Sequence, residues 1–172
     1  MDSIEKFREE FIENSCYRME ESLRMVTISL DQISEEQLWL KPNSALNSIG
    51  TLILHLCGNM TQYGIASLLE LKDTRNRDAE FAADGGYSKQ ELLDLLSTTI
   101  DRVKNSMNTV TLDRLISKKQ VQGFEFSGIG NIVHLVEHLS YHTGQIAFWV
   151  KQLKNEQLGF YDGHDLNTKN QN

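Results

Sequence analysis

The sequence predicts an all-α protein built as a four-helix bundle. Helical periodicity runs through almost the whole chain, strand alternation is nearly absent, and four long amphipathic segments can be separated. A chain of 172 residues with 40% apolar residues can bury one sizeable core. We therefore expect a single bundle domain over residues 1–155, followed by a polar C-terminal tail over residues 156–172.

The first two helices are indicated by apolar residues that recur at steps of three and four. The first is expected over about residues 3–30, and the stretch SEEQ at 34–37 then has the form of a capping box. The second is expected over about residues 47–71, beyond the only proline, Pro42. It carries His55 within an apolar context.

The third and fourth helices start at recognisable N-terminal signals. The stretch SKQE at 88–91 forms a second capping box, and Ser127 is the expected N-cap of a fourth helix that ends near Lys154. Residues 119–128 indicate an extended turn before this last helix. A long polar connection, residues 72–87, joins the second and third helices and can cross one end of the bundle. Connections of this length are often functional.

Composition argues against several classes of protein. The net charge of −7 and the pI near 5.2 make a nucleic-acid partner unexpected, because such binding depends on clustered Lys and Arg. The sequence has no secretion signal and no apolar run long enough to span a membrane, so we expect a cytoplasmic protein without a membrane partner. Cys16 and Cys57 form no CxxC pair and are expected to be buried thiols.

Three of the five histidines are clustered in the fourth helix. The stretch VHLVEHLSYHTGQI at 133–146 places His134, His138 and His142 at intervals of four. Four residues of an α-helix turn through about 400°, so neighbouring members are offset by only about 40° and can face one point. His134 and His142 are about 80° and 12 Å apart, so the three cannot easily bind one ion. A further ligand should come from another helix, and His55 is the obvious donor, because an unpaired imidazole is costly to bury.

Such a set of imidazoles suits a divalent transition metal. Imidazole nitrogens bind Zn²⁺, Ni²⁺ and Fe²⁺, and three ligands on one side leave a coordination position for water or substrate. The alternative interpretation is that the histidines are core residues that only hydrogen-bond their neighbours.

The motif EHLSYHTGQI, together with SIGTLILHL and SEEQLWLKP earlier in the chain, resembles the DinB/YfiT-like family of small four-helix metalloproteins. The resemblance covers most of the chain, to about residue 155. It implies that the metal is held by one histidine of the second helix and an HxxxH pair of the fourth. In this sequence these positions are His55, His138 and His142.

The same assignment leaves three residues as candidate neighbours of the site. His134 falls outside the ligand set, as either a pocket residue or a plain helix-face histidine. Asn59 lies one turn after His55, and Gln145 belongs to the HxGQ part of the motif.

The resemblance also implies a chemistry. Members of the family include S-transferases that use low-molecular-weight thiols such as bacillithiol, and a metal makes a bound thiol more acidic. We therefore predict a metal-dependent thiol S-transferase acting on small electrophiles. Cys57 is not expected to supply the sulfur, because it points about 160° away from His55 around the helix.

Two other functions stay open from the sequence. One is a metal-dependent hydrolase that uses a metal-bound water. The other is a non-catalytic metal-binding bundle or sensor. Many relatives form homodimers, which implies that this chain could also form one.

Overall fold

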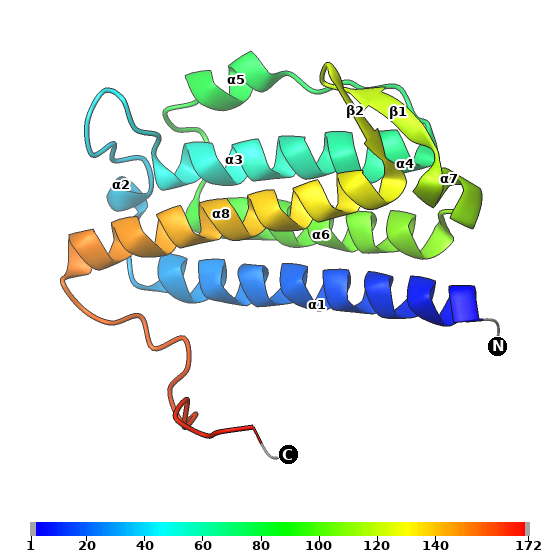
Figure 1. The fold of residues 1–172 in the computed structure, drawn as a ribbon. Helices are drawn as coiled ribbons and strands as arrows, with labels where there is room; N and C mark the ends of the chain where they lie inside the picture. Colours follow the sequence, from blue (N-terminus) through cyan, green and yellow to red (C-terminus); the bar gives the residue numbers. More distant parts are fainter. Residues whose placement is uncertain (1–2, 171–172) are drawn as a thin grey trace.

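Four long helical rods lie side by side in the computed structural model, which describes residues 3–170 (Figure 1). The rods are α1 (Ser3–Asp31), a rod that begins as α3 (Ile49–Met60), α6 (Lys89–Thr109) and α8 (Gly128–Lys154). The predicted all-α four-helix bundle is confirmed. Shorter elements join the rods: α2 (Glu35–Leu38), α5 (Arg77–Ala82), α7 (Leu112–Ile116), β1 (Lys118–Val121) and β2 (Phe124–Ser127).

The core lies between the rods, because each contributes one apolar face. α1 packs along α8 and α6, and α3 packs along α6 and α8. Each fully buried Leu, Ile or Met stabilises the fold by about 1.5–3 kcal/mol relative to an exposed one. The side chains with no exposed surface include Met19, Leu30, Ile53, Leu56, Met60, Leu92, Leu96, Leu135, Leu139 and Ile146.

The helix starts lie where the sequence signals them. Ser34 and Ser88 each close a capping box in which the serine and the residue three positions later exchange hydrogen bonds. The Ser127 hydroxyl accepts from the Gly130 backbone N–H at 3.1 Å and caps α8. These bonds satisfy backbone donors that the first helical turn leaves without partners.

The second rod differs from the uninterrupted helix expected over residues 47–71. It starts at Ile49, changes into a π-helical segment, η1 (Thr61–Ala66), and ends with α4 (Ser67–Leu69). Gly64 lies in η1, where the side chains of α6 and α8 approach its backbone closely, and the Ser106 hydroxyl donates to its carbonyl oxygen. A π-helical turn is often found beside a functional site. Here it directly follows the turns that carry His55 and Asn59.

Both connections contain secondary structure, and the first runs back along the second rod instead of crossing one end of the bundle, because α3 and α6 start at the same end (Figure 1). Residues 72–87 contain α5, which lies over α3, and the predicted extended turn at 119–128 is the β1–β2 hairpin. Gln122 and Gly123 form the tip, and both have positive φ, as a tight two-residue hairpin requires. Figure 1 shows α5 and the hairpin on the same side of the bundle, above the second rod.

Beyond α8, the chain turns back along α1. Leu158 is buried, and its carbonyl oxygen accepts from the Gln32 side chain at 3.1 Å. The Phe160 carbonyl oxygen accepts from Arg24 at 2.9 Å. Within residues 3–170, none of the helices combines the length and the apolar character that a membrane crossing needs.

We expect the close contact at Gly64 to make its replacement destabilising. A Cβ atom there would lie 2.9 Å from both Val103 methyl groups and 3.0 Å from a Leu135 methyl group. Gly64→Ala should therefore lower the free energy of unfolding by about 1–3 kcal/mol, as overpacked cores do. Gly144 is the control, because it lies in α8 with nothing within 4 Å of an added Cβ. Gly144→Ala should raise stability by up to about 1 kcal/mol through helix propensity. Urea unfolding measures both, and a Gly64→Ala protein as stable as the Gly144→Ala protein would contradict the packing argument.

Candidate metal centre

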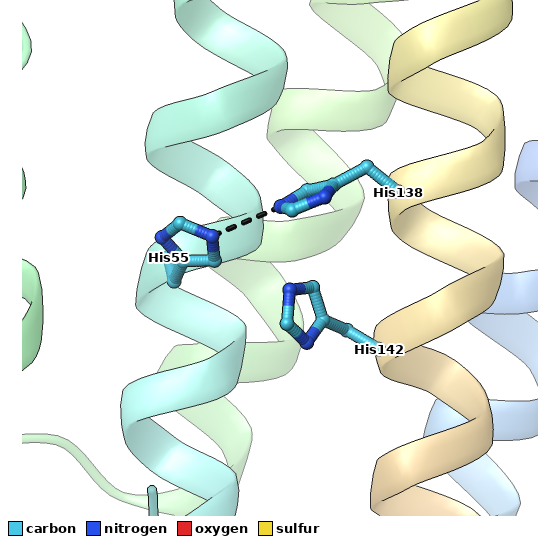
Figure 2. A group of neighbouring side chains, drawn as sticks. All are labelled: His55, His138 and His142. Carbon is cyan, nitrogen blue, oxygen red and sulfur yellow. Dashed lines mark hydrogen bonds between the residues drawn. The ribbon is translucent and has the colours of Figure 1, made fainter.

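Three histidines converge between α3 and α8. His55 projects from α3, and His138 and His142 project from successive turns of α8, so that the three rings point toward one another (Figure 2). The Nε2 atoms of His55 and His138 are 2.9 Å apart. One ring nitrogen from each of the three lies within 4.8 Å of the other two. The structure thus brings together the three residues that the sequence motif singled out.

The ring of His55 is oriented by an ion pair from the connection that follows its rod. Its Nδ1 lies 3.1 Å from a Glu80 carboxylate oxygen, and Arg75 donates to both oxygens of Glu80 at 2.8 Å. The Arg75 guanidinium also lies 3.0 Å from Nδ1. In the tautomer in which Nδ1 donates to the Glu80 carboxylate, which only accepts hydrogen bonds, the lone pair of His55 is on Nε2. This is the arrangement in which a carboxylate supports a metal-binding histidine. Residues 72–87 therefore lie against His55.

The ring of His142 is oriented by Gln145, a residue of the same helix. Its Nδ1 lies 2.7 Å from the Gln145 side-chain oxygen, which accepts the Nδ1 proton and leaves the Nε2 lone pair free. His138 Nε2 faces Nε2 of His55, and one of the two nitrogens donates its proton to the other. A divalent cation between these two nitrogens would take the place of that proton.

Burial keeps the three imidazoles uncharged at neutral pH. Loss of solvation lowers the pKa of His55 from 6.5 to about 4, although the Glu80 carboxylate opposes the shift. Burial and the neighbouring imidazoles lower the pKa of His138 from 6.5 to about 3, and burial also lowers the pKa of His142. A neutral imidazole is the form that binds a metal, so the cluster is ready to bind at pH 7.

The geometry and the donor set fit a divalent transition metal. Zinc–imidazole bonds of about 2.0–2.1 Å put two ligand atoms about 3.3 Å apart at a tetrahedral angle. The Nε2 atoms of His55 and His138, at 2.9 Å, would move apart by about 0.4 Å to reach this separation. The ligand atom of His142, which lies within 4.8 Å of the other two, would move toward them. His55, His138 and His142 would hold the ion through Nε2.

The candidates Asn59 and His134 contact each other, and the His134 ring also stacks on His138 of the three-histidine cluster. The Asn59 side-chain amide donates to His134 Nε2 at 3.3 Å, and the His134 ring packs on Tyr63 with centroids 4.2 Å apart. His134 is thereby placed outside the group of three, one turn toward the start of α8. Asn59 is 3% exposed, and its Oδ1 has no hydrogen-bond partner among the described residues.

A pocket of about 620 Å³ opens directly beside the cluster, and we call it the histidine pocket. One wall is a row of four stacked rings, in the order Phe124, Phe126, His134 and His138. The centroids of successive rings are 6.0, 6.1 and 5.4 Å apart, and the angles between successive ring planes are 26°, 14° and 21°. Its lining residues are His55, Asn59, Tyr63, Arg75, Arg77, Gln122, Phe124, Phe126, His134 and His138.

A second pocket, of about 600 Å³, lies beside Gln145, and we call it the apolar pocket. Leu46, Leu52, Phe148 and Trp149 form much of its lining, with Gln145 as a polar member. The residue that orients His142 therefore also faces this pocket.

Cys57 takes no part in either pocket. Its thiol is hydrogen-bonded to Thr99, and burial raises its pKa to about 12. A thiol in this state is not a nucleophile at neutral pH. The expectation that Cys57 points away from the cluster is confirmed.

Sequence reasoning missed Glu80, Arg75 and the two hairpin phenylalanines. The length of the 72–87 connection was a signal for the first two, but nothing in the local pattern distinguishes Glu80 from the other acidic residues there. Phe124 and Phe126 alternate with polar residues in a four-residue strand, which is too short to signal a pocket wall.

Comparison with known proteins supports the fold. A family model described as "Protein of unknown function (DUF1572)" matches residues 6–161. No curated protein matches the chain. The solved structure of a DinB-like protein, YjoA from Bacillus subtilis, has a TM-score of 0.65 at 16% identity, over 86% of this chain and 96% of that one. A conserved protein from Enterococcus faecalis has a TM-score of 0.65 at 14% identity, over 91% of this chain and 100% of that one. At these identities the likeness is one of fold alone.

Removal of the Gln145 side-chain oxygen should weaken metal binding without removing a ligand. Gln145→Leu leaves the Nδ1 proton of His142 without its acceptor, so the ring loses both its tautomer preference and its orientation. Loss of such a supporting contact typically costs about 10–100-fold in metal affinity. Competition with a chromophoric chelator measures the effect. Gln152→Leu is the matched control, because Gln152 is exposed on the same helix and lines only the apolar pocket. Equal affinities for the two variants would show that Gln145 does not support the site.

The stability of the metal-free protein should fall as the pH falls below about 6.5. The folded chain holds His55 and His138 neutral down to pKa values of about 4 and 3, whereas the unfolded chain takes up protons near 6.5. The unfolded state therefore binds more protons below 6.5, and stability is fully present only above that value. Urea unfolding between pH 7.5 and 4.5 measures the slope. His138→Phe should reduce it, and replacement of the exposed His164, outside the cluster, should leave it unchanged. A flat profile for the original chain would refute the assignment.

Proposed function

This chain belongs to the DUF1572 family, a family of unknown function. We propose that it is a metal-dependent thiol S-transferase. The reaction would join the sulfur of a small thiol to a small electrophile and release the thiol proton with the leaving group. The observation that carries the proposal is the convergence of three neutral, oriented imidazoles beside an open pocket.

The number of ligands favours catalysis over a structural role. Structural zinc sites usually complete four protein ligands, often with thiolates. In the described part of the chain the group contains three histidines and no thiolate, and Cys57 faces α6 instead. The remaining coordination position would face the histidine pocket. These features argue against the alternative of a non-catalytic bundle or sensor.

The acid–base groups favour a thiol over a water nucleophile. A hydrolase needs a general base near the metal-bound water. Glu80 is occupied by Arg75 and His55, and none of the described residues lining the histidine pocket is Asp or Glu. A bound divalent metal would itself lower the pKa of a thiol and make the thiolate available at neutral pH. The hydrolase therefore remains the second candidate.

Two pockets suit a reaction between two small molecules. The histidine pocket presents cationic and aromatic side chains, and the apolar pocket presents aliphatic and aromatic ones. We propose that the thiol enters through the first and that the electrophile approaches from the side of Gln145. Zinc, nickel or iron(II) would serve as the metal, because all three accept imidazole ligands. A cytoplasmic location, the absence of nucleic-acid and membrane partners, and a homodimer remain part of the proposal.

Metal analysis of protein purified without a histidine tag tests whether the three histidines bind a metal ion. After reconstitution and gel filtration, the chain should retain close to one Zn²⁺, Ni²⁺ or Fe²⁺. His55→Ala, His138→Ala and His142→Ala should each abolish retention, because each removes one of three ligands. His134→Ala should weaken affinity by no more than about 10–100-fold. A chain that retains no metal would defeat the proposal, as would a requirement for His134 in place of His142.

The same proteins then separate transferase from hydrolase. Each is incubated with a small thiol and 1-chloro-2,4-dinitrobenzene, and formation of the thioether is followed by absorbance. The three ligand variants should be inactive, and Cys57→Ala should keep its activity because its sulfur is buried against Thr99. Thiol-independent hydrolysis of a nitrophenyl ester by the metal-loaded chain, without thioether formation, would favour the hydrolase.

A further inference from the structure

Arg77 is held at the mouth of the histidine pocket by stacking. Its guanidinium lies 4.5 Å from the centre of the Phe81 ring, and the Phe81 ring lies 4.7 Å from the His55 ring. A cation over an aromatic face is attracted by the ring and loses much of its freedom. The stack from Arg77 through Phe81 to His55 therefore fixes a positive charge beside the metal centre.

Apart from its contact with the Phe81 ring, the charge of Arg77 has no ion-pair partner within the described part of the protein. No carboxylate between residues 3 and 170 lies within ion-pairing distance of it, although the chain carries a net charge of −7. Its neighbour Arg75 is the opposite case. Arg75 donates to both oxygens of Glu80 and to the Gln62 side-chain oxygen, and its side chain is 3% exposed. Arg75 thus serves the fold, whereas Arg77 is free to bind an anion.

A second, independent feature of this pocket also indicates a ligand. Asn59 lines it and is 3% exposed, yet its Oδ1 accepts no hydrogen bond from any described residue. Buried polar atoms nearly always have a partner, because an unsatisfied one is costly. The Asn59 amide is held in place by its bond to His134, and its buried Oδ1 is left without a donor in the wall of this pocket.

We propose that the histidine pocket selects a small thiol that carries a carboxylate, with Arg77 binding the carboxylate and Asn59 Oδ1 accepting from an N–H of the same molecule. The inference rests on the proposed function, because the sulfur must reach the three histidines from this pocket. The stacked wall of Phe124, Phe126 and His134 then lies against the body of the ligand. A charge-assisted bond to a guanidinium is among the stronger polar contacts in proteins.

A matched pair of thiols tests the role of Arg77. Isothermal titration of the full chain compares 3-mercaptopropionate with 3-mercapto-1-propanol, which share the sulfur and the chain length and differ in charge. The original protein should bind the carboxylate at least about tenfold more tightly. Arg77→Gln should remove this preference and leave the affinity for the neutral thiol unchanged. Arg102→Gln is the control, because Arg102 is exposed on α6 outside this pocket, and it should keep the preference.

A third probe tests Asn59. N-acetyl-L-cysteine adds an amide N–H to the carboxylate thiol and should bind the original protein more tightly than 3-mercaptopropionate. Asn59→Leu should remove this gain. Asn105→Leu is the control, because Asn105 is exposed on α6 outside this pocket, and it should retain the gain. A gain that survives in Asn59→Leu would overturn the assignment of Oδ1.

Titration with and without one equivalent of Zn²⁺ separates this inference from the proposed function. The ratio of affinities between the charged and neutral thiols reports on Arg77, and the dependence of both affinities on Zn²⁺ reports on the metal centre. Equal, zinc-dependent affinities would overturn the role of Arg77 alone. A carboxylate preference lost in Arg77→Gln but independent of Zn²⁺ would overturn the thiol–metal proposal alone.

Discussion

The burial of uncharged imidazoles between α3 and α8 is the constraint on which the rest of the site depends. A buried imidazole is tolerated only when its N–H has an acceptor, because an unsatisfied polar group in the core is costly. Glu80 supplies that acceptor to His55, and Gln145 supplies it to His142. Each acceptor bonds to Nδ1 and so directs Nε2 toward the centre of the cluster. The same contacts that make the histidines tolerable in the core therefore make them suitable as ligands.

This requirement extends to the elements outside the bundle. The Glu80 side chain is only 10% exposed, so its charge would be costly without the two hydrogen bonds that Arg75 donates to it. Arg75 also donates a hydrogen bond to the Gln62 side-chain oxygen. All three residues come from the second rod or from the connection after it. These contacts hold α5 over α3 beside His55. The same position brings Arg77 and Phe81 to the edge of the histidine pocket.

The π-helical segment explains how one rod can face a long row of residues on another. Residues spaced by four on α8 drift by about 40° at each step, so His134 leaves the direction shared by His138 and His142. A π-helix has more than four residues per turn, so four residues fall short of a full turn instead of exceeding it. Tyr63, which lies in η1, therefore faces the histidine pocket, and its ring packs on His134. The pocket therefore continues past the three-histidine cluster as an aromatic wall.

The sequence by itself determined the helices, their capped starts, and the residues that could form the cluster. These features depend on contacts within a few residues, such as the bond of Ser88 with Glu91 or the spacing of His138 and His142, and a periodic pattern records such contacts directly. The tertiary structure decided which groups complete the site. Glu80 lies 25 residues from His55, and the hairpin phenylalanines reach His134 through a turn whose fold depends on positive φ at Gln122 and Gly123. Such partners are chosen by packing between distant segments, where one acidic residue in a polar connection resembles another until the chain is folded.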